Sequence, residues 1–148
     1  MTHWRPAKSI RVKALGLHWR QGGLLAAEVL DDTGCVKGVR PLGGSVEFGE
    51  TWQDALHREF MEELSVPIDT FGAPLVMENI YSHHGQTGHE VLFIAEVRFS
   101  ETAFEHQNQI TFYEDNGTRC TARWFDIDTL DTPKGLALFP TGLKQHLR

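Results

Sequence analysis

The 148-residue sequence is poor in cysteine and has no long apolar run. Its two cysteines, Cys35 and Cys120, form no CxxC pair or metal-spaced set. We therefore expect reduced thiols in a reducing compartment, which favours a cytoplasmic location. No run approaches the roughly 20 apolar residues of a membrane span. The first residues, MTHWRPAKS, lack the apolar centre of a signal peptide.

Positive charge is also scarce, with 14 lysines and arginines against 20 aspartates and glutamates and no basic block. A nucleic-acid polymer is therefore not an expected partner. The GxSxG pattern of a serine nucleophile is missing as well. No internal repeat or linker divides the chain, and 41% of its residues are apolar. This length and composition predict one domain over residues 1–148, large enough to bury a core.

A helix is predicted within the segment Gly43 to Val66, GGSVEFGETWQDALHREFMEELSV. Thr51 and Asp54 match a variant of the capping box that begins a helix. Neither Gly nor Pro occurs again until Pro67, which ends the run. At about 100° per residue, the apolar side chains share one stripe that should face the core. They are Trp52, Ala55, Leu56, Phe60 and Leu64.

Three glutamates crowd this helix beside its apolar stripe. Glu59 follows Trp52 by seven residues and Glu63 follows Leu56 by seven, so both lie within roughly 20° of a core-facing neighbour. Glu62 flanks them. Carboxylates this close repel one another and lose hydration unless a cation compensates, and a hard cation such as Mg²⁺ suits them. The alternative is a solvated acidic face paired with Arg58, which the position of the glutamates disfavours.

The same residues resemble the Nudix box. Gly44 is followed after five residues by Glu50 and, after seven more, by Arg58-Glu59-Phe60-Met61-Glu62-Glu63-Leu64-Ser65-Val66. Every fixed position of the family pattern matches except one, because Ser65 replaces a glycine. Ser65 follows the helix, where a left-handed backbone is common. In that conformation serine costs up to about 1 kcal/mol relative to glycine.

The resemblance implies an α/β fold, a Nudix-like α/β/α sandwich with a mixed β-sheet. It also implies Mg²⁺, or Mn²⁺ in its place, held by Glu59, Glu62, Glu63 and the backbone carbonyl of Gly43. Arg58 would orient Glu59, and Glu50 would support the site from just outside the helix. The implied activity is that of a nucleotide pyrophosphohydrolase, in which water attacks phosphorus in the diphosphate linkage of a nucleoside diphosphate derivative.

A further carboxylate from outside the helix is expected to take the proton of the attacking water. Glu90, Glu105 and Glu114 are the three candidates. Glu114 is favoured, because it lies in the turn sequence Tyr113-Glu114-Asp115-Asn116-Gly117, which can hold a side chain in a fixed place. Glu105 has no such turn around it, and Glu90 could be a surface residue at the edge of the sheet.

The rest of the chain predicts strands and a C-terminal helix. A hairpin is expected from residues 10–19 and 24–30, and a long polar loop over residues 100–117. The other strands are expected over residues 35–42, 75–82, 90–99 and 119–127, with the apolar run 91–95 central in the sheet. A short helix is expected from Pro140 to the end of the chain.

Substrate-binding side chains are harder to assign from the sequence. Arg40, just before the glycine loop, is a candidate for binding a phosphate. Tyr81 is a candidate for stacking on a base, as are Trp19 and Phe112, although core packing is the preferred interpretation for each of them. His83, His84 and His89 could form a transition-metal site with Glu90. Because neighbouring strand residues point to opposite faces, loop histidines without a metal are the preferred interpretation.

Two other functional classes are open to this sequence. One is a non-catalytic Nudix-fold module that binds or senses a nucleotide, and the other is an acidic domain that docks a protein. A module freed from catalysis would have little reason to keep every glutamate of the box together with Arg58. Substrate selectivity should lie in residues 81–89 and 100–117. By analogy with the family, a homodimer is possible.

Overall fold

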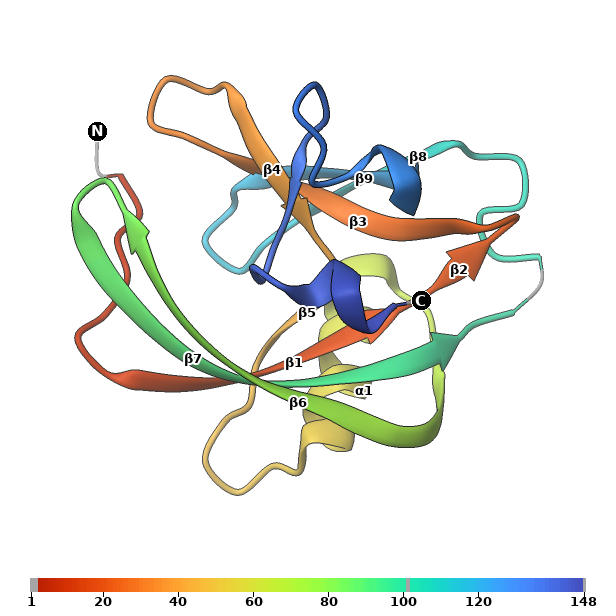
Figure 1. Cartoon of the computed structure of the whole chain (residues 1–148). Helices are drawn as coiled ribbons and strands as arrows, with labels where there is room; N and C mark the ends of the chain where they lie inside the picture. The colour runs from red at the N-terminus through yellow and green to blue at the C-terminus, as the bar shows by residue number, and fades with distance from the viewer. Residues whose placement is uncertain (1–2, 101, 148) are drawn as a thin grey trace.

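The computed structural model describes residues 3–100 and 102–147, in which two β-sheets pack with one α-helix (Figure 1). One sheet has the strand order β5-β1-β7-β6, and the other has the order β10-β4-β3-β9-β8, with β2 paired to β3. The strands are β1 (Ile10–Leu17), β2 (Trp19–Arg20), β3 (Gly23–Leu30), β4 (Val36–Arg40), β5 (Leu42–Ser45), β6 (Asp69–His83), β7 (Gln86–Arg98), β8 (Gln109–Tyr113), β9 (Arg119–Asp126) and β10 (Ala137–Leu138). The helix α1 spans Trp52–Leu64.

Both sheets are mixed. β1 runs parallel to β7 and antiparallel to β5, while β10 runs parallel to β4 and the other pairs of that sheet are antiparallel. β7, which contains the apolar run of residues 91–95, lies between β1 and β6, as the sequence predicts. Its parallel register places Glu90 beside Arg11, so the polar start of β7 adjoins the start of β1.

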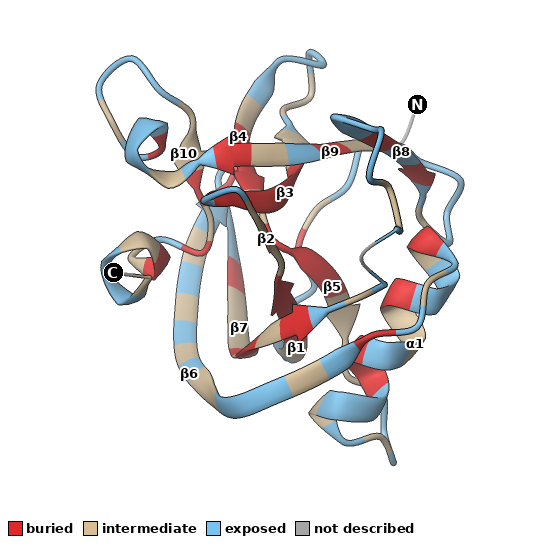
Figure 2. Cartoon of the chain, turned by 90° about the vertical axis from the view of Figure 1, so that its right-hand side faces the viewer, coloured by how far each residue is buried: buried red, intermediate tan, exposed pale blue. Residues whose placement is uncertain are grey.

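The helix α1 is stabilised by a side-chain cap at its start and by an apolar stripe that faces the core. The Thr51 hydroxyl accepts a hydrogen bond from the Asp54 amide at 3.1 Å, which confirms the predicted cap. Ala55, Leu56, Phe60 and Leu64 are buried, and buried positions alternate with exposed ones along α1 in Figure 2. Their burial against Ala14, Leu25 and Leu42 fixes α1 on one side of the strands.

A second core lies on the opposite side of the same strands. β1 and β3 send alternate residues to the two cores: Leu25 packs in the core with α1, whereas Leu15 and Leu24 pack with Leu138 and Leu143. Leu143 belongs to the 3₁₀ helix η2 (Leu143–His146). The predicted α/β class with mixed sheets is therefore confirmed, and the helical element facing away from α1 is a short 3₁₀ turn in place of the expected C-terminal helix.

Three other local predictions differ in part from the structure. Residues 10–19 and 24–30 pair only at Trp19 and Leu24, because β1 joins the first sheet and the chain leaves that sheet at His18, whose ring stacks on Phe99 at 3.8 Å between centroids. The expected loop of residues 100–117 contains β8. The strand expected at residues 75–82 begins earlier, at Asp69. A second 3₁₀ helix, η1, spans Ile127–Thr129.

Within the described part of the chain, no helix has the length and apolar character needed to cross a membrane.

Candidate functional site

Arg58, on α1, is held in place by several hydrogen bonds. Its guanidinium donates to both carboxylate oxygens of Glu50, at 2.8 and 2.9 Å, and to the Ser45 carbonyl at 3.0 Å. These bonds hold the pKa of Arg58 well above its usual range and lower that of Glu50 to about 2. Glu50 also accepts from the Glu47 amide at 3.0 Å. The glycine loop is thereby tied to α1 through one charged pair.

Glu59 lies directly against the glycine loop. Its carboxylate accepts a hydrogen bond from Arg58 Nη1 at 3.0 Å, and its side chain is only 14% exposed. Burial raises the pKa of Glu59 despite the nearby guanidinium. A Cβ at position 44 would collide with this carboxylate, so the glycine of the box is required for the close approach of loop and helix.

Glu63 carries the most perturbed carboxyl group of the site. Burial, followed by repulsion from Glu59, raises its pKa to about 8. Arg40 opposes this rise, while Glu114 and Asp115 add to it. Glu63 therefore lies among carboxylates with less positive charge than would balance them, which is the electrostatic condition that a divalent cation relieves.

Glu62 occupies a more open position than the other two helix glutamates. Its side chain is 43% exposed and its oxygen lies 3.4 Å from Arg58 Nη1. Among residues 3–100 and 102–147, Asp32, His83 and His84 form the only group of three His, Cys, Asp or Glu side chains whose ligand atoms all lie within 4.8 Å of one another. The three helix glutamates are thus not gathered as tightly as the sequence pattern suggests.

Glu114 reaches the site from the turn after β8. Its carboxylate lies 3.7 Å from Arg40 Nη2 and accepts a weak hydrogen bond from the Cys120 thiol at 3.4 Å. Hydrogen bonds from Glu114 N to Thr118 O and from Gly117 N to Glu114 O close the turn. Burial and this carboxylate together raise the pKa of Cys120 to about 12, so the thiol stays protonated and keeps its donor role.

Glu90 and Glu105 have different surroundings. Glu90 is 13% exposed, forms an ion pair with Lys13 at 3.2 Å and accepts from Asn79 at 3.4 Å. Glu105 is 48% exposed and pairs with its neighbour His106, in the turn that precedes β8. Glu90 and Glu114 thus lie beside the cations of the site, while Glu105 lies in an exposed turn.

Tyr81 lines a cavity of about 210 Å³ together with Arg11, Lys13, Ser45 and Glu90. Its ring packs on Gly88 of the paired strand, where any Cβ would collide with it. Trp19 instead donates to Glu96, and Phe112 is buried in the core with α1. Of the three candidate aromatics, Tyr81 is the one placed at a cavity.

Lys13 and Arg11 were missed by the sequence analysis. Burial and the neighbouring Arg40 lower the pKa of Lys13, and Arg11 donates to the Ser45 hydroxyl at 3.0 Å. Both residues alternate with apolar ones in β1, a pattern that gave no reason to single them out. Their role depends on the pairing of β1 with β5 and β7, which no local spacing encodes.

The donor set fits a hard divalent cation. Glu59 and Glu63 are half-buried carboxylates whose charged forms are disfavoured by burial, and Gly43 precedes Gly44, which adjoins the Glu59 carboxylate, in β5. Oxygen donors of this kind suit Mg²⁺ and Mn²⁺. Arg40 lies near Glu63, and Lys13 lies near Arg40 and Glu90. The arrangement places carboxylate oxygen atoms that suit a cation beside positive charge that suits an anionic ligand.

Comparison with known proteins agrees with this description. The family model of the NUDIX domain matches residues 20–146. The chain therefore belongs to the NUDIX domain family, and its fold is that of Nudix hydrolases. A search of the curated proteins finds no match.

Solved structures show the same fold. The MutT NUDIX hydrolase of Burkholderia pseudomallei is 23% identical, with a TM-score of 0.53 over 88% of this chain and 92% of that one. A NUDIX hydrolase of Nitrosomonas europaea is 20% identical, with a TM-score of 0.53 over 81% and 74%. The ORF135 protein of E. coli is 18% identical, with a TM-score of 0.55 over 88% and 81%.

Proposed function

We propose that this protein is a metal-dependent hydrolase that cleaves the diphosphate linkage of a nucleoside diphosphate derivative. The observation that carries the proposal is the pair Glu59 and Glu63, half-buried carboxylates with raised pKa values, the second of them near Arg40. A purely structural pair of this kind would destabilise the fold without compensation. Membership of the NUDIX domain family supports the same conclusion.

Glu59, Glu62 and Glu63, with the Gly43 carbonyl, would hold Mg²⁺ or Mn²⁺. The bound cation would neutralise the diphosphate and lower the pKa of a coordinated water. Arg58 supports this arrangement without contacting substrate, because its guanidinium is already engaged by Glu50, Glu59 and the Ser45 carbonyl. Its role is to fix the orientation of the Glu59 carboxylate.

Arg40 and Lys13 would bind the phosphate oxygens of the substrate. Each is paired with a carboxylate in the free protein, Arg40 with Glu114 and Lys13 with Glu90. An arriving diphosphate would compete for these cations and release one carboxylate to accept a proton. The water oxygen bonds to phosphorus, its proton passes to Glu114, and the bridging P–O bond breaks, which gives two phosphorylated products.

The cavity beside Tyr81 would take part of the substrate remote from the reacting phosphorus. Its lining includes the cations Arg11 and Lys13 as well as the Tyr81 ring. This combination favours a polar or phosphate-bearing group with a flat face that can stack. A nucleotide-derived substrate also agrees with the cytoplasmic location expected from the sequence.

A panel of nucleoside diphosphate derivatives, assayed with Mg²⁺ and a coupled phosphatase, tests the proposal. Release of phosphate that depends on both Mg²⁺ and the protein is the expected result. A nucleotide-binding module without activity would instead show stabilisation by the same compounds in thermal denaturation, with no phosphate released. That outcome would replace the hydrolase with the binding module.

A further inference from the structure

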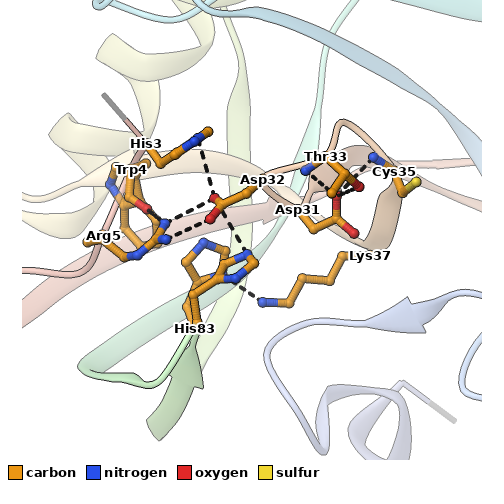
Figure 3. Close-up of polar contacts among 10 residues, drawn as sticks. His3, Trp4, Arg5, Asp31, Asp32, Thr33, Cys35, Lys37 and His83 are labelled. Atoms are coloured by element: carbon orange, nitrogen blue, oxygen red, sulfur yellow. Dashed lines mark hydrogen bonds and ion pairs between the residues drawn. The ribbon is translucent and has the colours of Figure 1, made fainter. Parts of the chain in front are cut away.

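A second cluster of metal-ligating side chains lies apart from α1, where three distant segments of the chain meet. Asp32 comes from the turn between β3 and β4, His83 and His84 from the tip of the β6–β7 hairpin, and His3 from the N-terminal segment. Figure 3 shows His3 and Arg5 directed at Asp32 and His83 joined to Lys37. The cluster shares no residue with the carboxylate site.

We propose that Asp32, His83 and His84, with His3 as a fourth ligand, form a binding site for Zn²⁺. The ligand atoms of Asp32, His83 and His84 all lie within 4.8 Å of one another. His84 Nε2 is 3.5 Å and His3 Nδ1 is 3.6 Å from the same oxygen, Asp32 Oδ1. Contraction around an ion at the usual 2.0–2.2 Å from each ligand requires only small side-chain movements.

The backbone at His84 brings the two neighbouring histidines to one place. His84 and Gly85 both have positive φ, 49° and 80°, in the two-residue turn that closes the hairpin. His84 therefore lies outside the strand and escapes the alternation of strand side chains. The two rings lie 4.6 Å apart and perpendicular. The expectation that His83 and His84 point to opposite faces is wrong for this reason.

The chemistry of the donors suits zinc better than magnesium. Imidazole nitrogens with one carboxylate are common ligands of Zn²⁺, while Mg²⁺ prefers oxygen atoms alone. Hydrogen bonds from Arg5 lower the pKa of Asp32 to about 2, and burial lowers that of His83. A negative carboxylate and a neutral imidazole are the forms that coordinate a metal.

In the metal-free protein, two positively charged side chains occupy part of this site. Arg5 donates to both Asp32 oxygens, at 3.0 and 2.6 Å, and Lys37 Nζ lies 2.7 Å from His83 Nδ1. Arg5 can keep Oδ2 while Oδ1 coordinates, as a group that orients the ligand. Lys37 cannot stay: whichever ring nitrogen binds the metal, Nδ1 then has no free electron pair to accept its proton. Lys37 thus competes with the ion.

Zinc at this position would join the N-terminal segment to the hairpin. A cavity of about 680 Å³ lies between residues 6–10 and residues 85–89, next to the cluster. Without the metal, the segment is held to Asp32 by Arg5 and to His83 by an edge contact of Trp4 at 5.2 Å. The bound ion would add coordinate bonds from His3 and Asp32 to this charged contact and so stiffen the wall of this cavity.

Titration with Co²⁺, a spectroscopic substitute for Zn²⁺, tests the site. The full chain, freed of metal by a chelator, is titrated in excess Mg²⁺ so that the helix carboxylates are occupied. Four-coordinate nitrogen and oxygen ligation gives intense visible absorption, whereas six oxygen ligands give only a weak band. The variants are His84→Asn, which tolerates a left-handed backbone, Asp32→Asn and Lys37→Ala. The control is His106→Ala, since His106 is 91% exposed.

We expect one intense Co²⁺ site in the wild type and in H106A, displaced by Zn²⁺. H84N and D32N should each weaken binding at least tenfold, and K37A should tighten it severalfold. An equal affinity for the wild type and H84N, or a wild type without the intense absorption, would overturn the proposal. An unchanged affinity in K37A would overturn the competition by Lys37. Circular dichroism of each variant, compared with H106A, identifies any loss of folding.

Discussion

Single residues at the end of α1 show how closely the box pattern describes the backbone. Ser65 has φ 57° and ψ 34°, and its amide donates to the Met61 carbonyl at 3.0 Å. Ser65 stands where the family pattern has glycine, and the left-handed conformation predicted for this position is confirmed. Serine at this position retains the cap and accepts a backbone penalty that glycine would avoid.

Ser65→Gly should stabilise the protein by up to about 1 kcal/mol. The change removes the Cβ penalty at a left-handed position and leaves the carboxylates untouched, so the rate of hydrolysis should change little. Chemical denaturation measures the effect, with Ser65→Ala as the control, because alanine keeps the Cβ. Destabilisation by glycine would show that the hydroxyl of Ser65 matters more than the backbone strain.

Glu63 predicts an unusual dependence of stability on pH in metal-free protein. Its pKa is about 8 in the folded state, above the 4.5 of an unperturbed carboxyl group. The folded protein therefore holds this proton more tightly than the unfolded chain does. Stability should fall as pH rises from about 4.5 to about 8 and then level off.

Glu63→Gln removes this titration. With a chelator present, the variant should be more stable than the wild type at pH 8, by on the order of 1–2 kcal/mol since partial solvent access reduces the full effect. The difference should disappear near pH 4. Adding Mg²⁺ should stabilise the wild type and not the variant. Parallel stability curves for the two proteins from pH 4 to pH 8 would contradict the raised pKa.

At the scale of elements, the helix could be predicted from local sequence rules, whereas the pairing of the strands could not. The cap at Thr51, the apolar stripe and the end before Pro67 all depend on residues within a few positions of one another, and all were predictable. The β1–β7 pairing, the strand β8 and the sheet change at His18 depend on partners far along the chain. Lys13 and Arg11 could not be recognised for the same reason.

Thr51→Ala should destabilise the protein by about 1 kcal/mol, because the Asp54 amide loses its capping partner. Thr51→Ser keeps a hydroxyl at the same position and is the matched control, with a change of a few tenths of a kcal/mol. Urea denaturation of the three proteins measures both values. Equal losses for alanine and serine would show that the Thr51 methyl group, rather than the hydroxyl, stabilises the start of α1.

The turn between β8 and β9 is expected to supply the proton acceptor, Glu114. Glu114→Gln should lower kcat by 10² or more with little change in KM, a typical effect of losing a general base. Glu105→Gln is the matched control, because Glu105 pairs with His106 in an exposed turn. It should leave kcat unchanged.

Glu90→Gln completes the comparison. It should mainly raise KM, since Glu90 holds Lys13 in place at 3.2 Å. The pH profile of kcat in each variant distinguishes the two roles, because only the base removes a titrating limb. If Glu90→Gln lowered kcat severely and Glu114→Gln left it unchanged, the general base would be Glu90 and not Glu114.

At the scale of the whole molecule, one compact arrangement serves two groups of charged residues. The strands of the first sheet bring Glu90, Lys13 and Tyr81 to the lining of one cavity, while the hairpin tip of β6 and β7 carries His83 and His84 to Asp32. Of the first group, Glu90 and Tyr81 were candidates from the sequence, whereas Lys13 was not. The second required the left-handed turn at His84, which the sequence does not specify.

In the proposed function, the half-buried carboxylates of α1 hold a cation for diphosphate cleavage. The most direct measurement compares wild type and Glu63→Gln on the most active compound of the diphosphate panel, with and without Mg²⁺, by phosphate release. The wild type should turn over only with the metal, and the folded variant should lose more than 10²-fold in rate, because the amide keeps the shape and removes the charge. Near-normal turnover by Glu63→Gln, or turnover by the wild type that ignores Mg²⁺, would contradict the account.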